Sequence, residues 1–178
     1  MRPRPKVLIE RAVELYGKDD VVHWAATLLC GQPAGDDLDI GLLGGSPGRA
    51  PYWSRVWGAR AFLYVWDESA SAAVIDGLGD GHWRVREMCA KVCRRRALAE
   101  GAAALAVLAG DPVVRVRVSV YNAIADICEA DSADPLLAAS FESPREADEA
   151  AAAVRRMEQR LDRRLRSPTD GDRGDRQR

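Results

Sequence analysis

The sequence predicts an all-α fold built from stacked helix pairs, and two observations carry this prediction. The segment Asp-Gly-His-Trp-Arg-Val-Arg at residues 80–86 returns 31 residues later as Asp-Pro-Val-Val-Arg-Val-Arg at 111–117. Apolar residues recur at helical spacing along most of the chain, whereas the alternating pattern of strands is nearly absent. A period of about 30 residues with helical spacing is typical of stacked helix pairs, so the repeat determines the predicted architecture.

Aspartate, serine and proline mark where several of these helices should begin. Asp111 is expected to cap a helix whose first position is Pro112, and Ser143 followed by Pro144 repeats this signal further along the chain. Residues 31–51 are rich in glycine, proline and aspartate and should hold only a short, imperfect helix. The expected helices cover about residues 7–16, 19–30, 38–43, 52–66, 69–78, 82–98, 100–109, 112–128, 134–141 and 144–166.

The helices are expected to form one domain, because 178 residues are enough for a single buried core. That domain covers residues 1–166, with an N-terminal cap at 5–50, the best repeats at 68–128 and a C-terminal capping helix at 144–166. Residues 167–178 have no apolar side chain beyond one proline and mix aspartates with arginines, so we expect a disordered tail.

A short helix, an aspartate turn and a long helix with Val-Arg form a pattern that resembles the HEAT-repeat family, including bacterial HEAT-like repeat proteins. The resemblance is strongest over 68–128 and weaker over 36–66 and 133–166. It implies an α-solenoid of about four helix pairs, wound as a right-handed superhelix. In that family the turn aspartate and the arginine six residues later form hydrogen-bonded ladders between repeats. By resemblance this structural ladder consists of Asp80, Arg86, Asp111 and Arg117.

The first and last units depart from the repeat pattern. In the helix from Tyr52 the arginine position falls on Val56 or Trp57, and Glu142 stands roughly where the last aspartate would be. Atypical end units are expected of caps, which close the stack against solvent.

Composition and cysteine usage exclude several classes of protein. The chain has 26 basic and 27 acidic side chains, so no net charge draws it to nucleic acid or to anionic membranes. No long apolar run follows the basic first residues, and we therefore expect a cytoplasmic protein without a membrane span. With only two histidines available as further ligands, the cysteines should pack as small apolar side chains, and neither a metal nor a cofactor is expected. These cysteines are Cys30, Cys89, Cys93 and Cys128.

The sequence contains no recognisable catalytic constellation. The glycine-rich stretch at 41–48 lacks the Lys-Ser/Thr of a phosphate loop, neither histidine has a metal-binding spacing, and no Gly-x-Ser-x-Gly elbow occurs. We therefore expect no catalytic residue and no enzymatic activity.

Positive charge is concentrated in the predicted helix from His82. Residues 82–97 hold six basic side chains against Glu87 alone, a local net charge of +5. By resemblance to HEAT stacks, the second helix of each pair lines a concave surface, so Arg84, Lys91 and Arg95 are candidates to bind an acidic partner. The alternative is a solvated face, and residues 111–127, with two arginines against two aspartates, do not extend the charge.

Aromatic side chains are concentrated in the predicted helix from Tyr52. Trp53, Trp57 and Tyr64 share one helical face by their spacing. If exposed, the two tryptophans beside Arg60 would form a stacking or cation–π surface of the kind found at interaction hot spots. The alternative is that these rings cover the irregular segment 31–51.

The expected function is that of a non-catalytic protein-interaction or scaffold module, whose concave face binds another protein with an acidic segment. The alternative is a nucleic-acid-binding protein related in architecture to the alkylpurine DNA glycosylases. Against it, the chain is short for that family and not basic overall, and Asp80 and Asp111 are already assigned to turns. Phycobilin lyases share such repeats, but no residue here marks a bilin site. The oligomeric state is not predicted. The expected partner-binding residues are Arg84, Lys91, Arg95, Trp53, Trp57 and Arg60.

Overall fold

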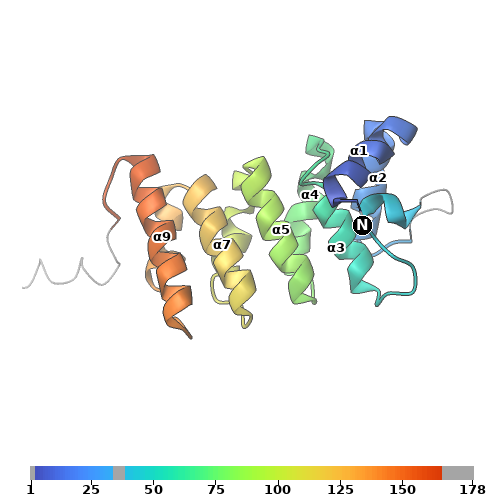
Figure 1. Ribbon diagram of the computed structural model, residues 1–178. Helices are drawn as coiled ribbons and strands as arrows, with labels where there is room; N and C mark the ends of the chain where they lie inside the picture. The colour runs from blue at the N-terminus through green and yellow to red at the C-terminus, as the bar shows by residue number, and fades with distance from the viewer. Residues whose placement is uncertain (1–2, 34–38, 166–178) are drawn as a thin grey trace, which may run out of the picture. The chain divides into compact units, whose positions relative to one another are not determined.

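The computed structural model describes residues 3–33 and 39–165, and over these residues the chain folds into helices and turns without any strand (Figure 1). The predicted all-α class is thereby confirmed for the described part of the chain. Contacts divide the protein into two compact units, Met1–Arg96 and Ala97–Arg178, and each is described by itself. The expected tail at 167–178 and the start of the short helix expected at 38–43 lie outside the described residues.

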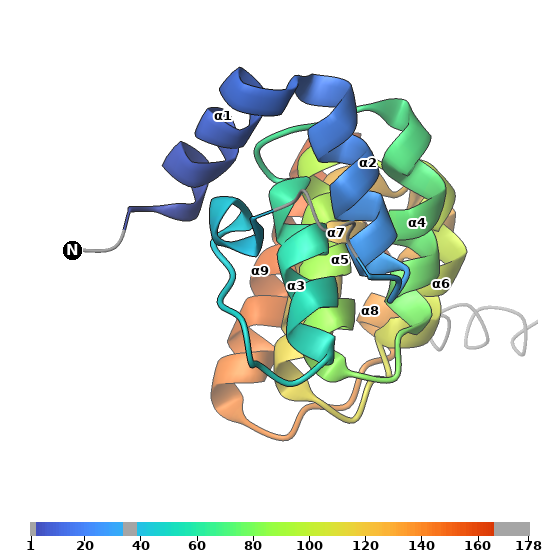
Figure 2. The same cartoon turned by 90° about the vertical axis from the view of Figure 1, so that its right-hand side faces the viewer.

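Unit 1 is arranged in two helical layers, one formed by α2 and α4 and the other by α3 and α5. Helix α3 packs against both α2 and α5, and α1 packs against η1 and α2 (Figure 2). The elements of unit 1 are α1 (Pro5–Tyr16), α2 (Lys18–Leu29), η1 (Ile40–Leu43), α3 (Tyr52–Ala61), η2 (Glu68–Ala70), α4 (Ser71–Asp76), η3 (Gly77–Gly79) and α5 (Trp83–Arg96).

The core of unit 1 is made by the apolar faces of these helices, and α2 and α3 come close enough for their backbones to touch. Gly58 lies at this crossing, where a Cβ atom would collide with the carbonyl oxygen of Ala25. Absence of a side chain at this position lets the two helix backbones touch, which explains a glycine in the middle of a helix despite its low helix propensity.

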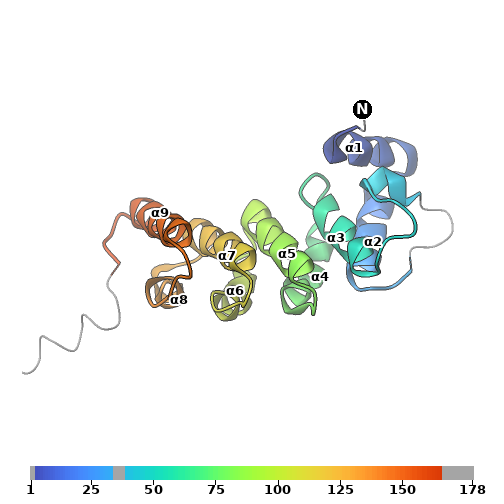
Figure 3. The same ribbon diagram turned by 60° about the horizontal axis from the view of Figure 1, so that its bottom comes forward.

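Unit 2 repeats the two-layer arrangement, with α7 and α9 in one layer and α6 and α8 in the other (Figure 3). Tyr121, Ile124 and Met157 are fully buried where α7 and α9 face each other. The elements of unit 2 are η4 (Ala99–Gly101), α6 (Ala102–Leu108), α7 (Val114–Ile127), η5 (Ala130–Ser132), α8 (Asp134–Leu137) and α9 (Pro144–Leu161).

The helices expected from the sequence are present, but three of them are shorter than predicted at their C-terminal ends. Helix α3 stops at Ala61, where the next carbonyl, that of Phe62, accepts a hydrogen bond from Arg96 Nε at 2.7 Å. Helix α8 stops at Leu137, and α9 stops at Leu161, where Asp162 takes a left-handed conformation. The prediction of helix over 62–66, 138–141 and 162–166 was therefore wrong for the described residues of these segments.

Two predicted helix starts have opposite outcomes. Ser143 caps α9 as expected, since its hydroxyl accepts the backbone N–H of Glu146. Asp111 does not cap α7: its carboxylate accepts the N–H of Val113 at 2.8 Å, which forms a turn, and the helix begins at Val114. The aspartate signal was real, but it marks the turn before the helix instead of the helix itself.

Candidate partner-binding site

The expected binding residues of unit 1 occupy equivalent positions on α3 and α5. Starting at Trp53 and at Arg84, residues follow at steps of four, three and four, which keeps them along one side of each helix. Every position on α5 is 31 residues after its counterpart on α3, so the two rows have the same place in the repeat. The rows are Trp53, Trp57, Arg60 and Tyr64 on α3 or just beyond it, and Arg84, Met88, Lys91 and Arg95 on α5.

Arg84 and the aromatic rings form a cluster where α3 and α5 begin. The guanidinium carbon of Arg84 lies 4.2 Å from the ring centroid of Trp83 and 5.4 Å from that of Trp53. Beside them the rings of Tyr52 and His82 are stacked, with centroids 3.5 Å apart and planes 6° apart. We call Tyr52, Trp53, His82, Trp83 and Arg84 the aromatic–arginine cluster. All five side chains are half-buried, so the cluster is both packed and accessible.

The turn before α5 holds this cluster in place. Asp80 accepts the backbone N–H of His82 at 2.7 Å, which fixes the chain just before the helix. The same carboxylate accepts two hydrogen bonds from Arg55 of α3, from Nε at 2.6 Å and from Nη2 at 3.2 Å. This bidentate pair ties the start of α5 to α3 and thereby sets Trp53 against Arg84.

His82 contributes a neutral ring to the cluster at neutral pH. Its Nδ1 accepts the backbone N–H of Arg84 at 3.3 Å, which requires that nitrogen to be unprotonated. Desolvation, followed by the positive charge of Arg84, lowers the pKa of His82 below its usual value. The positive charge of the cluster therefore comes from Arg84 alone.

Trp57 and Arg60 both contact the segment that precedes α3. Trp57 is buried, and its ring packs so closely on Gly45 that a Cβ there would come within 2.6 Å of it. Arg60 reaches back from α3 to donate a hydrogen bond to the carbonyl of Leu43 at 2.8 Å. The alternative interpretation, in which rings cover the segment 31–51, thus agrees with the contacts of Trp57, while Arg60 is half-buried and its guanidinium bonds within the fold, so both are weaker candidates than Arg84.

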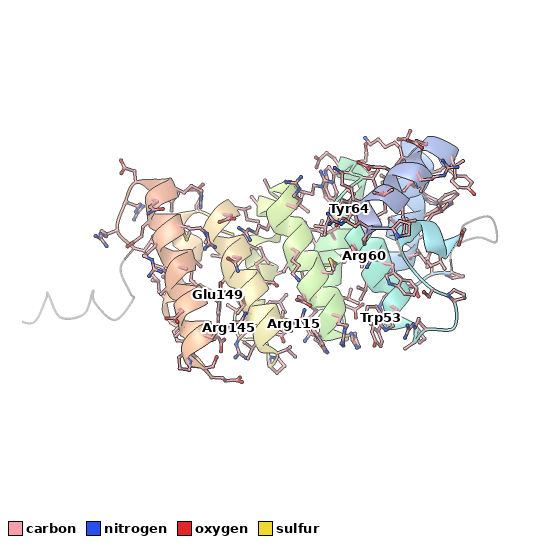
Figure 4. All side chains as sticks on the ribbon, viewed as in Figure 1. Trp53, Arg60, Tyr64, Arg115, Arg145 and Glu149 are labelled. Carbon is pink, nitrogen blue, oxygen red and sulfur yellow. The ribbon has the colours of Figure 1, made fainter. Side chains whose placement is uncertain are left out.

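Desolvation and position distinguish Arg60 further from the exposed side chains of its row. Burial lowers the pKa of Arg60, and its Nε has no hydrogen-bond partner among the described residues. Figure 4 shows Arg60 between Trp53 at one end of α3 and Tyr64 beyond the other. Tyr64 is exposed, Trp53 and Arg60 are half-buried and Trp57 is buried, so Tyr64 is the most accessible side chain of the α3 row.

The remaining two basic candidates lie further along α5 and are accessible. Lys91 donates a hydrogen bond to Glu87 at 2.8 Å, so its positive charge is partly compensated by an acid of the same helix. Arg95 is exposed one turn later. Arg96, its neighbour, instead donates to Phe62 and lies over the ring of Trp66 at 5.5 Å, which assigns it a structural role.

The expected ladder residues make the same bond in both copies of the repeat. Arg86 Nη1 donates to the backbone carbonyl of Asp80 at 2.8 Å, and Arg117 Nη1 donates to that of Asp111 at 2.7 Å. In each unit the arginine thus clamps the turn six residues before it. The carboxylate of Asp80 in turn binds Arg55, an arginine that the sequence analysis did not identify.

Arg55 could have been found from the repeat period. It precedes Arg86 by the same 31 residues that separate Arg86 from Arg117, whereas we had placed this position at Val56 or Trp57. Arg117 reproduces its role in unit 2 by pairing with Glu142 at 2.9 Å. The expectation that Glu142 stands in for the last aspartate therefore agrees with its contacts.

Unit 2 has no comparable aromatic–arginine cluster among its described residues. Arg115, which follows Arg84 by one repeat, and Arg145 at the start of α9 are exposed, and Glu149 lies one turn after Arg145 (Figure 4). The aromatic residues here are Tyr121, which is buried, and Phe141, which packs edge to face against it. Mixed charge without rings makes this unit the weaker candidate for a binding surface.

The cysteines and titratable groups of the described residues suggest no metal centre. No group of three or more His, Cys, Asp or Glu side chains is placed to hold an ion in the described ranges. Burial raises the pKa of Cys89, in agreement with its expected role as an apolar side chain, and Cys93 and Cys128 are buried as well. Cys30 is exposed at the end of α2, so the expectation of burial was wrong for this residue.

Comparisons with known proteins add no family to these observations. No protein-family model matches the chain, and no curated protein shows significant sequence similarity to it. In the described part of the chain, no helix is both long enough and apolar enough to cross a membrane.

Proposed function

We propose that the chain is a HEAT-like α-solenoid and acts as a non-catalytic interaction module that binds another protein. The observation that carries the proposal is the contact between Arg84 and Trp53, which occupy the same position in successive repeats. Together with Trp83, they bring a cation and two large rings into one half-buried patch. Tryptophan and arginine are the side chains most often found at the energetic centres of protein interfaces.

The solenoid assignment is supported by features that recur with the repeat. The two-layer packing occurs in both units, and the arginine clamp on the turn carbonyl is the same in each. An arginine also pairs with the acidic residue 25 positions later in each unit, as Arg55 does with Asp80 and Arg117 with Glu142. Repeated contacts of this kind are typical of quasi-one-dimensional repeat proteins.

Binding of nucleic acid, as in a protein related to the alkylpurine DNA glycosylases, is the second candidate. Arg84, Lys91 and Arg95 would supply its positive charge. The candidate has less support, because the aspartates at the turns before α5 and α7 are engaged in local hydrogen bonds and are not free to act as a base.

A cross-linking capture from the native host tests the proposed function. We would compare the wild type with a triple variant of the α5 row, Arg84→Glu, Lys91→Gln and Arg95→Glu; glutamine is used at position 91 because Glu87 lies beside it. The matched control makes the same change in net charge at other exposed positions. It is the triple variant Lys6→Gln, Arg11→Glu and Arg49→Glu.

The expected result is that partners captured by the wild type and the control are lost from the α5-row variant. Thermal unfolding of all three proteins shows whether they remain folded. If the folded α5-row variant captures the same partners as the control, the proposed surface is wrong. A protein captured in a salt-dependent manner only through nucleic acid, and released by nuclease, would favour the second candidate.

A further inference from the structure

Two cations of the α5 row, Arg84 and Arg95, form no ion pair with a described residue, and of these two only Arg84 is held against aromatic rings. We propose that the partner recognised by this surface is a protein segment rich in aspartate and glutamate, and that one of its carboxylates binds the N–H edge of the Arg84 guanidinium. This inference rests on the proposed function and names the chemistry of the partner.

Three neighbouring arginines of unit 1 form hydrogen bonds within the fold. Arg55 pairs with Asp80, Arg60 donates to the carbonyl of Leu43, and Arg96 donates to that of Phe62. The guanidinium of Arg84 has neither a hydrogen bond nor an ion pair with any described residue, and its contacts are those with the two tryptophan rings. Unlike these three, Arg84 is held in place while its guanidinium donors have no hydrogen-bond acceptor among the described residues.

The hydrogen-bond donors of Arg84 remain available to a ligand. A guanidinium carries five N–H donors, and the contacts of Arg84 with the two rings use none of them in a hydrogen bond, so these donors remain available. Contact with Trp83 and Trp53 also restricts the side chain, which lowers the entropy lost when a ligand binds. A carboxylate fits the edge of a guanidinium with two parallel hydrogen bonds, and such bonds are the strong ones.

The charges around Arg84 favour an extended acidic ligand over a single carboxylate. Lys91 lies seven residues further along α5 and Arg95 another four, which correspond to about 10 Å and about 6 Å along a helix. In an extended polypeptide, side chains on one face are about 7 Å apart, so consecutive acidic residues reach all three cations without a special register. His82 is neutral and adds no charge of its own.

The rings of the cluster argue against single-stranded nucleic acid as the ligand. Sequence-tolerant binding of single strands relies on bases stacking on aromatic faces. Here each ring of the cluster already has a stacking partner: Tyr52 lies on His82, Trp53 on the buried ring of Trp57, and Trp83 contacts both His82 and Arg84. A base would have to displace Arg84 from Trp83, whereas a carboxylate leaves these contacts intact.

Fluorescence anisotropy with defined probes tests the inference on the full-length protein. The probes are fluorescein-labelled decaglutamate, fluorescein-labelled decaglutamine and a labelled 12-nucleotide oligothymidylate. The variants are Arg84→Gln, which removes the cation, and Arg84→Lys, which keeps the charge without the planar edge. Arg11→Gln is the matched control, because Arg11 is exposed on α1 and its loss changes the net charge equally.

We expect decaglutamate to bind the wild type and decaglutamine not to bind. Arg84→Gln should weaken decaglutamate binding about tenfold or more, as expected for loss of charge-assisted hydrogen bonds, while Arg11→Gln should change it by less than about twofold. Arg84→Lys should resemble Arg84→Gln more than the wild type, because a lysine cannot present two parallel donors. A change in tryptophan fluorescence on binding decaglutamate should accompany these results and be absent from Arg84→Gln.

Three results would overturn the inference: no binding of decaglutamate, equal weakening by Arg84→Gln and Arg11→Gln, or tighter binding of oligothymidylate than of decaglutamate. Failure here is distinguishable from failure of the proposed function. If the α5-row variant loses its captured partners but decaglutamate does not bind, the surface is real and its ligand is not acidic. If capture is unaffected, the proposed function itself is wrong.

Discussion

Replacement of Glu146 by glutamine should destabilise unit 2 more than any other conservative change at a charged residue of its described part. Glu146 lies at the start of α9 and is 1 % exposed. Its carboxylate accepts hydrogen bonds from Arg117 Nε at 2.5 Å and Nη2 at 2.9 Å, from the backbone N–H of Glu142 at 3.0 Å and from the hydroxyl of Tyr121 at 3.3 Å. Glutamine keeps the shape but turns one accepting oxygen into a donor that faces other donors.

The magnitude follows from the burial of both partners. Removal of one member of a buried ion pair costs about 3–5 kcal/mol, because the remaining charge is left without compensation. Arg117 retains Glu142 as a second acidic partner, so we expect the lower end, about 3 kcal/mol. For a protein of this size that corresponds to a fall in Tm of roughly 6–12 °C.

Glu142→Gln is the matched control, since it removes the other carboxylate from the same arginine. The Glu142 side chain is 65 % exposed, and a pair with so accessible a carboxylate contributes less than about 1 kcal/mol. Calorimetry or circular dichroism of both variants measures the difference. Equal Tm values for Glu146→Gln and Glu142→Gln would refute the reasoning, because burial would then not determine the cost of losing the carboxylate.

The stabilisation by the Glu146 carboxylate should depend on pH. Hydrogen bonds from Arg117 lower the pKa of Glu146 in the folded protein. A carboxyl group with a lowered folded-state pKa stabilises the fold above its unfolded pKa of about 4.3 and loses that contribution as the pH falls through the folded value. The gap in Tm between the wild type and Glu146→Gln should therefore be constant near neutral pH and narrow below about pH 4.

Three further predictions concern unit 1 and the cysteines. Gly58→Ala should lower stability by about 1–3 kcal/mol in urea unfolding, because its Cβ meets the backbone of α2, whereas Gly79→Ala, with open space around it, should be neutral or slightly stabilising. Lys18→Ala should raise the pKa of Asp67 from about 2 towards its ordinary value in an NMR titration, since the Lys18 hydrogen bond is the main cause of the low value. Cys30 alone should react quickly with a thiol reagent in the native protein, and rapid modification of a second cysteine would contradict the buried positions. The protected thiols are those of Cys89, Cys93 and Cys128.

The fold class and the helix order were predictable because they depend on hydrophobic spacing and on the aspartate turns. Helix ends were less predictable, since tertiary contacts decide them. Nothing near Phe62 in the sequence signals a stop, and the carbonyl that ends α3 is bound by Arg96, 34 residues away. Asp111 shows the converse case, in which a correct local signal for a turn was assigned to the helix that follows it.

The candidate site was predictable in part. Arg84 was selected for its place in a basic helix, and the sequence also pointed to Trp53, but their contact depends on how α3 packs against α5. Trp57 and Arg60 were selected by the same spacing and proved to be occupied by the segment that precedes α3. Helical spacing determines which residues share a face, whereas burial of that face depends on a loop without any periodic pattern.

The abundance of arginine in this chain is better explained by helix packing than by ligand binding. Arg55 and Arg117 bind acidic residues at the starts of helices, while Arg96 and Arg160 donate to carbonyls at the ends of the preceding helices, at Phe62 and at Ala125 and Cys128. The positions of Arg96 and Arg160 are favourable, because the C-terminal end of a helix carries the negative end of its dipole and attracts a cation. An arginine bound in this way is unavailable to a partner, so local charge alone is a poor guide to function here. Arg84 differs from these packing arginines because two tryptophan rings hold it, while its guanidinium has no acidic partner among the described residues.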